Sequence, residues 1–268
     1  MKKLGLLGCG AIGEGVALFV EKELSSKVRL SSLLDIEREK AQALKSKLSK
    51  FKPVVVDSLD SLFKKSDLIL ESASWRVVRP LLEKALNYRK DLIILSVGGL
   101  LSQEEILKKV EKKGINIYLP SGAICGVDGV LASSCAKIKK CLLITSKPPQ
   151  GFKGVEYIKN KKINLNTSQK KILFRGKAEQ AFKYFPQNIN VASTLLFASK
   201  FKDLQVEIVL EPKLKRNTHK IYLLSQIGKI EVEVENIPSS LNPKTSSLAI
   251  ASAQALLRKM FSSLKIGT

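Results

Sequence analysis

The residues with the clearest chemical meaning lie near the start of the chain. Gly8-Cys9-Gly10-Ala11-Ile12-Gly13 matches the dinucleotide-binding pattern G-x-G-x-x-G. The pattern follows a short apolar run at 3–7 and precedes apolar residues at helical spacing, which is the strand–loop–helix context that it requires. In such a loop the three glycines permit the tight turn, the close approach of a pyrophosphate and the packing of helix on strand. The amides at the helix start would then bind the phosphates.

An acidic residue stands where the ribose of such a cofactor would be held. Asp35 follows the second apolar run, 28–34, and lies 22 residues beyond Gly13. A carboxylate at this place accepts hydrogen bonds from the ribose hydroxyls and repels a 2′-phosphate. The sequence therefore favours NAD, while Arg38 close by keeps NADP as the alternative.

Two segments of small residues follow later predicted strands. Glu71-Ser72-Ala73-Ser74 comes after the run 68–70, and Ser96-Val97-Gly98-Gly99 comes after the run 92–95. In an open α/β sheet the ligand lies at the carboxyl ends of the strands. We expect Ala73, Ser74, Ser96, Val97 and Gly98 to leave room for the nicotinamide half, with ordinary strand-to-helix turns as the alternative reading.

The only histidine is the strongest candidate for proton transfer. A nicotinamide cofactor carries a hydride, so the protein must handle the accompanying proton. Imidazole suits that task near neutral pH. His219 lies in Arg216-Asn217-Thr218-His219-Lys220, just before a predicted strand of the second half. A structural or solvent-facing histidine is the competing interpretation.

The elements that must position these residues alternate between strand and helix over residues 1–120. Short apolar runs at 3–7, 28–34, 54–56, 68–70, 92–95 and 115–119 alternate with amphipathic segments, among them 37–50 and 75–88. Ser102-Gln103-Glu104-Glu105 matches a capping box that would open a helix reaching Lys113. This pattern predicts a Rossmann-type doubly wound parallel sheet, covered on both faces.

The second half changes character after the glycine-rich segment that begins at Ser121. Alternating apolar residues predict strands at 206–210, 221–223 and 230–234, with a turn at 226–228. We also expect helices at 178–183 and 189–198. We expect an α+β substrate domain over 121–242 on a mainly antiparallel sheet, with 147–162 as an exposed loop. A closing helix within 243–268 would complete the first domain.

Composition narrows the function classes. The 268 residues carry 46 Lys and Arg against 24 Asp and Glu, a net charge of +22 that is scattered rather than gathered into a run. Without a recognised motif, this charge predicts no nucleic-acid partner. Four cysteines without a C-x-x-C pair and one histidine predict no metal site. The chain also offers no run of about 20 apolar residues. We therefore expect a soluble cytoplasmic protein that does not bind membranes.

Several strings together resemble the L-aspartate dehydrogenase family over nearly the whole chain. The more specific ones are Phe185-Pro186-Gln187-Asn188-Ile189-Asn190-Val191-Ala192, Asn217-Thr218-His219-Lys220-Ile221 and Asn242-Pro243-Lys244-Thr245-Ser246. Ser121-Gly122-Ala123-Ile124 and the glycine loop accompany them in the same order.

The resemblance implies NAD(P)-dependent oxidation of L-aspartate to iminoaspartate, which feeds NAD biosynthesis or hydrolyses to oxaloacetate and ammonia. It implies that His219 is catalytic and that Ala123, Asn188 and Asn190 contact the cofactor. It also implies a homodimer. Three alternatives remain at this point. They are a related amino-acid or imine dehydrogenase (homoserine dehydrogenase or dihydrodipicolinate reductase), a non-catalytic NAD-binding sensor, and a basic nucleic-acid binder.

Overall fold

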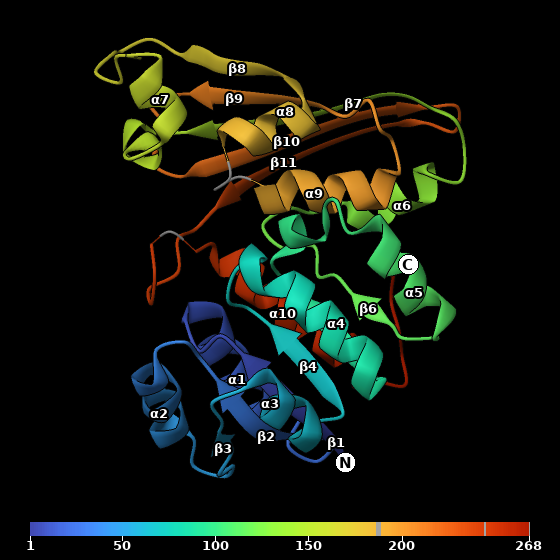
Figure 1. Ribbon diagram of the computed structural model, residues 1–268. Coiled ribbons are helices and arrows are strands. Elements are labelled where there is room, and N and C mark those ends of the chain that lie inside the picture. Colours follow the sequence, from blue (N-terminus) through green and yellow to red (C-terminus); the bar gives the residue numbers. More distant parts are fainter. Residues whose placement is uncertain (186–188, 244, 268) are drawn as a thin grey trace. The chain divides into compact units, whose positions relative to one another are not determined.

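The computed structural model describes residues 1–185, 189–243 and 245–267, and the chain divides into two units (Figure 1). Met1–Gly122 and Ala249–Ile266 form the first unit, and Ala123–Leu248 build the second. Each unit has its own sheet and its own hydrophobic core.

The sheet of the first unit contains six parallel strands. They are β1 (Lys2–Leu7), β2 (Val28–Leu34), β3 (Val54–Val55), β4 (Leu68–Glu71), β5 (Asp91–Ile94) and β6 (Ile117–Tyr118). Their order is β3-β2-β1-β4-β5-β6, and every neighbouring pair is parallel. This is the strand order of the doubly wound dinucleotide-binding fold, so the predicted fold class is confirmed.

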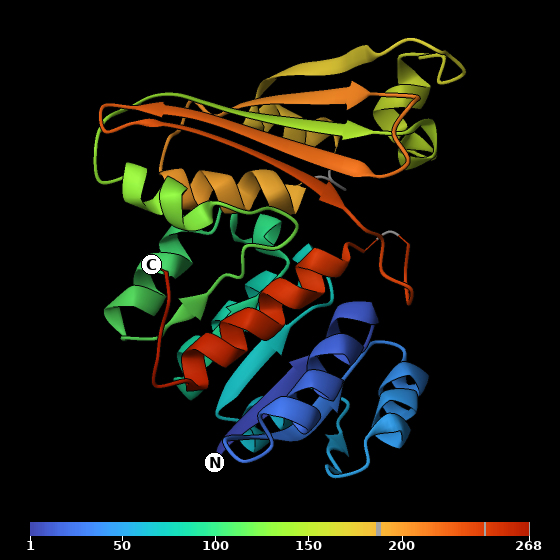
Figure 2. The same cartoon turned by 180° about the vertical axis from the view of Figure 1, so that it is seen from behind.

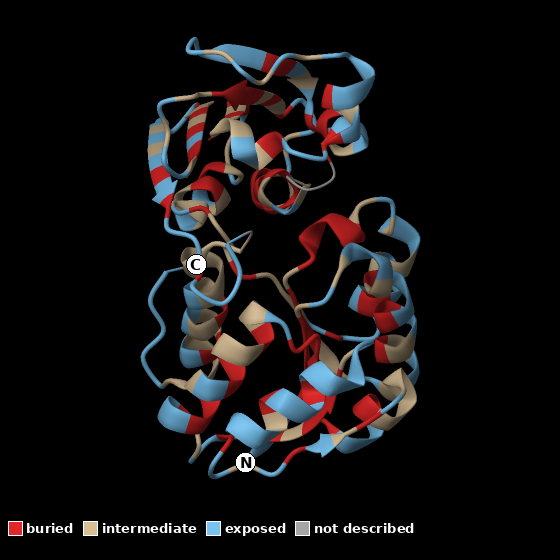
Figure 3. Cartoon of the chain, turned by 90° about the vertical axis from the view of Figure 1, so that its left-hand side faces the viewer, coloured by how far each residue is buried: buried red, intermediate tan, exposed pale blue. Residues whose placement is uncertain are grey.

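Helices connect these strands and bury their apolar sides. They are α1 (Ala11–Glu23), α2 (Arg38–Lys47), α3 (Leu59–Lys65), α4 (Val78–Tyr88) and α5 (Glu104–Lys112), with short 3-10 turns η1 (Trp75–Val77) and η2 (Val97–Leu100). The strands read as unbroken apolar runs because helices shield both faces of a parallel sheet. Figure 3 shows buried residues concentrated along these strands.

The expected capping box at the start of α5 is wrong. Gln103 is the N-cap of this helix, without a side-chain cap, and Ser102 lies before it with φ +61°. The Gln103 amide donates to the Leu100 carbonyl at 3.2 Å, so the turn of η2 continues through this segment. Ser102 is thereby held outside the helix and cannot serve as its cap.

Glu21 on α1 holds the segment that follows α2. Its carboxylate accepts from the amides of Ser49 (3.0 Å), Lys50 (2.7 Å) and Phe51 (2.8 Å) and from the Ser49 hydroxyl (3.2 Å). Glu21 is 7% exposed, and burial opposes its charge. The donated hydrogen bonds outweigh that burial and lower the pKa of Glu21 below its ordinary value of 4.5.

Glu21→Gln is expected to destabilise the protein by about 1.5–3 kcal/mol, the range for a hydrogen bond to a charged group. Because the folded pKa is lowered, this stabilisation is present above the unfolded pKa and fades as the pH falls through the folded value. Urea unfolding at pH 7 and at pH 3 measures both effects. Glu23→Gln, an exposed position on the same helix, is the matched control. An equal loss at both pH values would contradict the role of the charge.

The helix α10 (Ser247–Phe261) packs on α1 within the first unit (Figure 2). The Gln254 amide donates to the Gly15 carbonyl at 2.9 Å, and a Cβ on Gly15 would lie 2.5 Å from Ile250 Cγ2. Ala253 and Leu257 are fully buried in the core of this unit. The helix is shorter than the expected range 243–268, because Pro238 and Ser246 form an antiparallel bridge directly before it and residues 262–267 are not helical.

The sheet of the second unit contains five strands in the order β11-β10-β7-β9-β8. They are β7 (Ile138–Lys147), β8 (Lys171–Lys177), β9 (Gln205–Leu210), β10 (Asn217–Ser225) and β11 (Lys229–Asn236). β7 and β9 are parallel and the other pairs are antiparallel, as expected for a mainly antiparallel sheet. The hairpin at 226–228 is present, with the Ser225 amide donating to the Gly228 carbonyl at 2.9 Å.

Helices cover one face of this sheet (Figure 1). They are α6 (Val127–Ser133), α8 (Ala178–Tyr184) and α9 (Ile189–Ser199). The expectation of an exposed loop at 147–162 is wrong, because this segment contains η3 (Pro149–Phe152) and α7 (Glu156–Asn160). Phe152, Val155 and Ile158 from it are buried in the core. Phe152 ends η3, Val155 is the extended N-cap of α7 and Ile158 lies within α7, so all three parts of the segment contribute to the core.

No helix within the described ranges combines the length and the apolar character that are needed to span a membrane.

Candidate active site

The glycine loop between β1 and α1 is packed so tightly that two of its positions exclude a side chain. Gly8 has φ +93°, and a Cβ there would lie 2.7 Å from the Ala73 amide nitrogen and the Ser72 carbonyl oxygen. A Cβ on Gly13 would lie 2.1 Å from the Gly8 carbonyl oxygen. A Cβ on Gly10, by contrast, would meet nothing within 4 Å. The backbone at Gly10 therefore borders open space, as a pyrophosphate cradle requires.

The start of α1 faces this loop with its backbone. Gly10 is the N-cap and brings no side chain to cap the helix, and Ala11 and Ile12 are the first helical residues. Helix geometry leaves the first amides without an acceptor inside the helix. With the open space at Gly10, these donors fit the phosphates of a dinucleotide.

Asp35 reaches the same loop from the end of β2. Its Oδ2 accepts from the Cys9 amide at 2.6 Å, and its Oδ1 accepts from the Glu37 amide at 2.9 Å. The structure thus brings together the acidic residue and the glycine loop that the sequence paired by motif alone. Burial, followed by the charge of Asp35, raises the pKa of the Cys9 thiol to about 12, so this cysteine stays protonated near neutral pH.

Glu71 joins the two small-residue segments at the ends of β4 and β5. This glutamate is fully buried, and burial raises its pKa. It accepts from the amides of Ala73 (2.8 Å) and Ser96 (2.9 Å) and from the Ser96 hydroxyl (2.8 Å). Both segments are therefore fixed by the carboxyl group of Glu71. The sequence analysis named Glu71 as part of its segment but assigned it no role.

The predicted contacts within these two segments differ in accessibility. Ala73 is exposed and Ser74 is half-buried, so a ligand can reach both. Val97 and Gly98 are buried, and the Ser96 hydroxyl is directed at Glu71. At Ser96, Val97 and Gly98 the geometry thus favours a role in shaping the loop.

His219 lies within β10, two residues after the strand begins, whereas the sequence placed it just before a strand. It pairs with Thr145 on β7 and Val234 on β11. Paired residues share a face of a sheet, as do residues two apart on one strand. His219 therefore shares its face of the sheet with the core residues Ile221 and Leu223. Polar side chains begin on this face at His219.

The environment of His219 keeps its imidazole neutral. It is 6% exposed, and its Nδ1 lies 3.0 Å from the Thr145 hydroxyl. Burial, followed by the positive charge of Lys147, lowers the pKa of His219 to about 4. At neutral pH the ring is able to accept a proton, and the hydrogen bond at Nδ1 fixes its orientation.

Lys147 and Asn236 are polar residues of this same face that the sequence analysis missed. Lys147 ends β7, two residues after Thr145, and burial lowers its pKa to about 8. Asn236 ends β11 opposite Asn217. Its side-chain amide donates to the Ala123 carbonyl at 3.0 Å, and its oxygen accepts from the Ser246 hydroxyl. The apolar run at 141–144 was the available signal for β7.

The remaining predicted cofactor residues belong to the second unit. Ala123 is half-buried and held by Asn236. Asn190 is exposed in the first turn of α9. Asn188 lies outside the described residues, as does Lys244 of the Asn-Pro-Lys-Thr string. Among the described residues, no three His, Cys, Asp or Glu side chains gather into a group that could hold a metal ion.

Two protein families match the chain, one on each side of residues 121–127, close to the division after Gly122. Residues 8–120 match the family described as homoserine dehydrogenase, NAD binding domain, and residues 128–260 match aspartate dehydrogenase, C-terminal. L-aspartate dehydrogenases of Methanosarcina barkeri and Methanosarcina acetivorans are 36% and 38% identical to the chain, with full coverage of both proteins. A crystal structure of aspartate dehydrogenase from Thermotoga maritima is 27% identical. It superimposes with a TM-score of 0.76, covering 100% of this chain and 99% of that one.

Proposed function

The chain belongs to the L-aspartate dehydrogenase family, and we propose that it oxidises L-aspartate to iminoaspartate with NAD as hydride acceptor. The observation that carries the proposal is the neutral, buried imidazole of His219, in a chain that also has a dinucleotide cradle at Gly8–Gly13. The match of residues 128–260 to the aspartate rather than the homoserine dehydrogenase family supports this substrate. The reverse reaction is the reductive amination of oxaloacetate with ammonia.

The glycine loop, Asp35 and His219 have separate roles in the proposed reaction. The glycine loop and the first amides of α1 would hold the pyrophosphate, and Asp35 would hold the ribose. Bound NAD supplies the acceptor for the hydride that leaves Cα of the substrate. His219 accepts the proton that the amino group releases, at Nε2, because Nδ1 is engaged by Thr145. In the reverse direction the same nitrogen returns the proton.

The proposal is tested by the initial rate of NAD reduction with L-aspartate and of NADH oxidation with oxaloacetate and ammonia. L-Homoserine and dihydrodipicolinate serve as comparison substrates. Turnover that prefers either of them would overturn the substrate. NAD binding without turnover of any of these substrates would indicate a sensor rather than an enzyme.

We also propose that NAD is preferred over NADP. Both carboxylate oxygens of Asp35 are already fixed by amides at 2.6 and 2.9 Å, so the group cannot turn away from a 2′-phosphate. The ratio of kcat/KM for the two cofactors measures the preference. A ratio near one or below would contradict it.

Lys147 is proposed to bind a substrate carboxylate beside His219. It ends the strand that carries Thr145, and its ammonium makes no ion pair within the described part of the chain. Lys147 is half-buried, and a partly desolvated cation without a counter-ion is costly. A dicarboxylate substrate would provide the missing charge. The same ammonium contributes to the low pKa of His219.

Lys147→Met is therefore expected to raise KM for L-aspartate at least tenfold. Because the positive charge is gone, the pKa of His219 should rise from about 4 toward its ordinary value of 6.5. The acid limb of kcat/KM should then move to higher pH, since this limb reports the free enzyme. Lys139→Met, an exposed position on the same strand, is the control. An unchanged KM and pH profile would remove Lys147 from the site.

We further propose a cytoplasmic homodimer that forms through the second sheet. The face turned away from the helices carries the half-buried residues Leu142, Ile144, Tyr222 and Leu224. Analytical ultracentrifugation is expected to give twice the chain mass of 29.6 kDa. Cell fractionation tests the cytoplasmic location. A monomer at micromolar concentration would contradict the dimer.

A further inference from the structure

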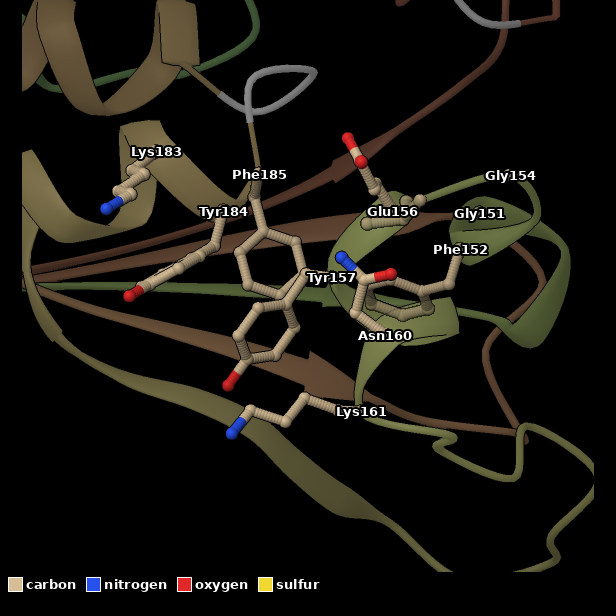
Figure 4. Close-up of a pocket in the computed structure, with 11 residues that line it drawn as sticks. Gly151, Phe152, Gly154, Glu156, Tyr157, Asn160, Lys161, Lys183, Tyr184 and Phe185 are labelled. Atoms are coloured by element: carbon tan, nitrogen blue, oxygen red, sulfur yellow. The ribbon is translucent and has the colours of Figure 1, made fainter.

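A cavity of about 540 Å³ lies in the second unit, and none of the described residues that line it has been assigned a role above (Figure 4). Its walls come from η3, α7 and the end of α8, and neither His219, Thr145 nor Lys147 lines it. Cavities of this volume accommodate small organic molecules. The proposed oxidation of aspartate gives this cavity no role.

Aromatic rings form one wall of the cavity. The Tyr157 ring centroid lies 4.9 Å from that of Tyr184 and 5.0 Å from that of Phe185, with the planes tilted by 49° and 51°. Phe185 is 2% exposed, so its ring is anchored in the core. Tyr184 is 37% exposed and presents its ring to a ligand. Fixed rings of this kind offer a flat molecule a stacking surface.

The rim of the cavity is positively charged. Lys161 and Lys183 line it together with one acidic residue, Glu156 (Figure 4). Neither lysine forms an ion pair with any residue that the structure describes, and the Lys183 ammonium lies 5.9 Å from the centroid of the Tyr184 ring. The rim therefore favours an anion next to the aromatic wall.

Two residues that line the cavity lie next to residues of the proposed mechanism. Gly151 lines it, and a Cβ on Gly151 would lie 3.0 Å from Lys147 Cβ. Phe185 lines it too, and Phe185 also lines a small void together with Thr145. A bound molecule would thus contact Gly151 and Phe185 without contacting His219, Thr145 or Lys147.

We propose that this cavity is a second binding site, selective for a planar aromatic carboxylate. The ring of the ligand stacks on the exposed ring of Tyr184 and meets the tilted ring of Tyr157 at an angle, and its carboxylate pairs with Lys161 and Lys183. The site is independent of the proposed dehydrogenase activity, so it can be tested whether or not the chain oxidises aspartate.

The test uses the fluorescent aromatic anion 8-anilinonaphthalene-1-sulfonate and the full chain with saturating NAD, which keeps the probe out of the dinucleotide cradle. The charge-reversed variant Lys161→Glu/Lys183→Glu is expected to weaken probe binding at least tenfold. The matched control is Lys153→Glu/Lys159→Glu, which changes two exposed lysines of the same region that do not line the cavity. Its net charge changes equally, and it should bind the probe within twofold of the unaltered chain.

Competition on the unaltered chain keeps the proposal testable if a variant fails to fold. 2-Naphthoate should displace the probe, whereas cyclohexanecarboxylate, with the same charge and no aromatic ring, should not. Equal weakening in both double variants would show that the probe reads only the overall charge. Equal displacement by both carboxylates would show that the aromatic wall plays no part. Either result would overturn the site.

Discussion

His219→Ala is expected to lower kcat for L-aspartate oxidation by on the order of 10²-fold or more while leaving NADH binding almost unchanged. The loss corresponds to at least about 2.7 kcal/mol of transition-state stabilisation. It is large because His219 is the only histidine, and its burial and the charge of Lys147 keep its ring unprotonated at neutral pH. Stopped-flow measurement of NADH formation, together with NADH fluorescence titration, separates the two effects.

Two companion variants distinguish proton transfer from a merely structural role. Thr145→Val removes the partner of Nδ1 and should lower kcat less than His219→Ala, because the proton acceptor remains. His219→Gln keeps a polar side chain at this position but cannot take the proton, so it should be as slow as the alanine variant. Activity of His219→Gln close to that of the unaltered chain would refute proton transfer at this residue.

Gly13→Ala is the second change with a large expected effect. The added methyl group would lie 2.1 Å from the Gly8 carbonyl oxygen, far inside van der Waals contact. The start of α1 must therefore move away from β1, which should cost about 1–3 kcal/mol of stability. The same shift displaces the amides that would hold the pyrophosphate. We expect Kd for NADH to rise at least tenfold, measured by fluorescence titration, and the midpoint of thermal unfolding to fall.

Gly10→Ala gives the informative contrast within the same loop. Its methyl group would meet nothing within 4 Å in the protein, so the unfolding midpoint should stay close to that of the unaltered chain. Its methyl group would occupy the space assigned to the pyrophosphate, so NADH binding should still weaken. If both variants left NADH affinity intact, the loop would not be the cofactor cradle.

The first half of the fold was predictable because each local signal agreed with the next. Apolar runs alternate with helical spacing over residues 1–120, and the glycine string fixes which loop faces a ligand. The strand order β3-β2-β1-β4-β5-β6 then follows from the doubly wound topology. Asp35 was picked out by its distance from Gly13 along the chain, and the structure places it against the loop at Cys9.

The second half was less predictable because its strands pair across long stretches of sequence. β7 was missed because its central residues 141–145 are almost uninterrupted apolar residues, which hides the alternation. With β7 missing, Thr145 and Lys147 could not be placed beside His219, since only the pairing of β10 with β7 brings them together. The segment 147–162 was interpreted as an exposed loop because of its two prolines and two glycines, and the three apolar residues that anchor it were overlooked.

The position of α10 bears on how the protein matures. The first unit draws its last helix from residues 249–261, and Ala253 and Leu257 fill the core beside Val16 and Ala17. Domains generally fold as units while the chain is being synthesised, but here residues 1–122 depend on a helix that is made only after residues 123–248. The glycine loop is therefore synthesised before the second unit and gains the support of α10 only after residues 123–248 have been made.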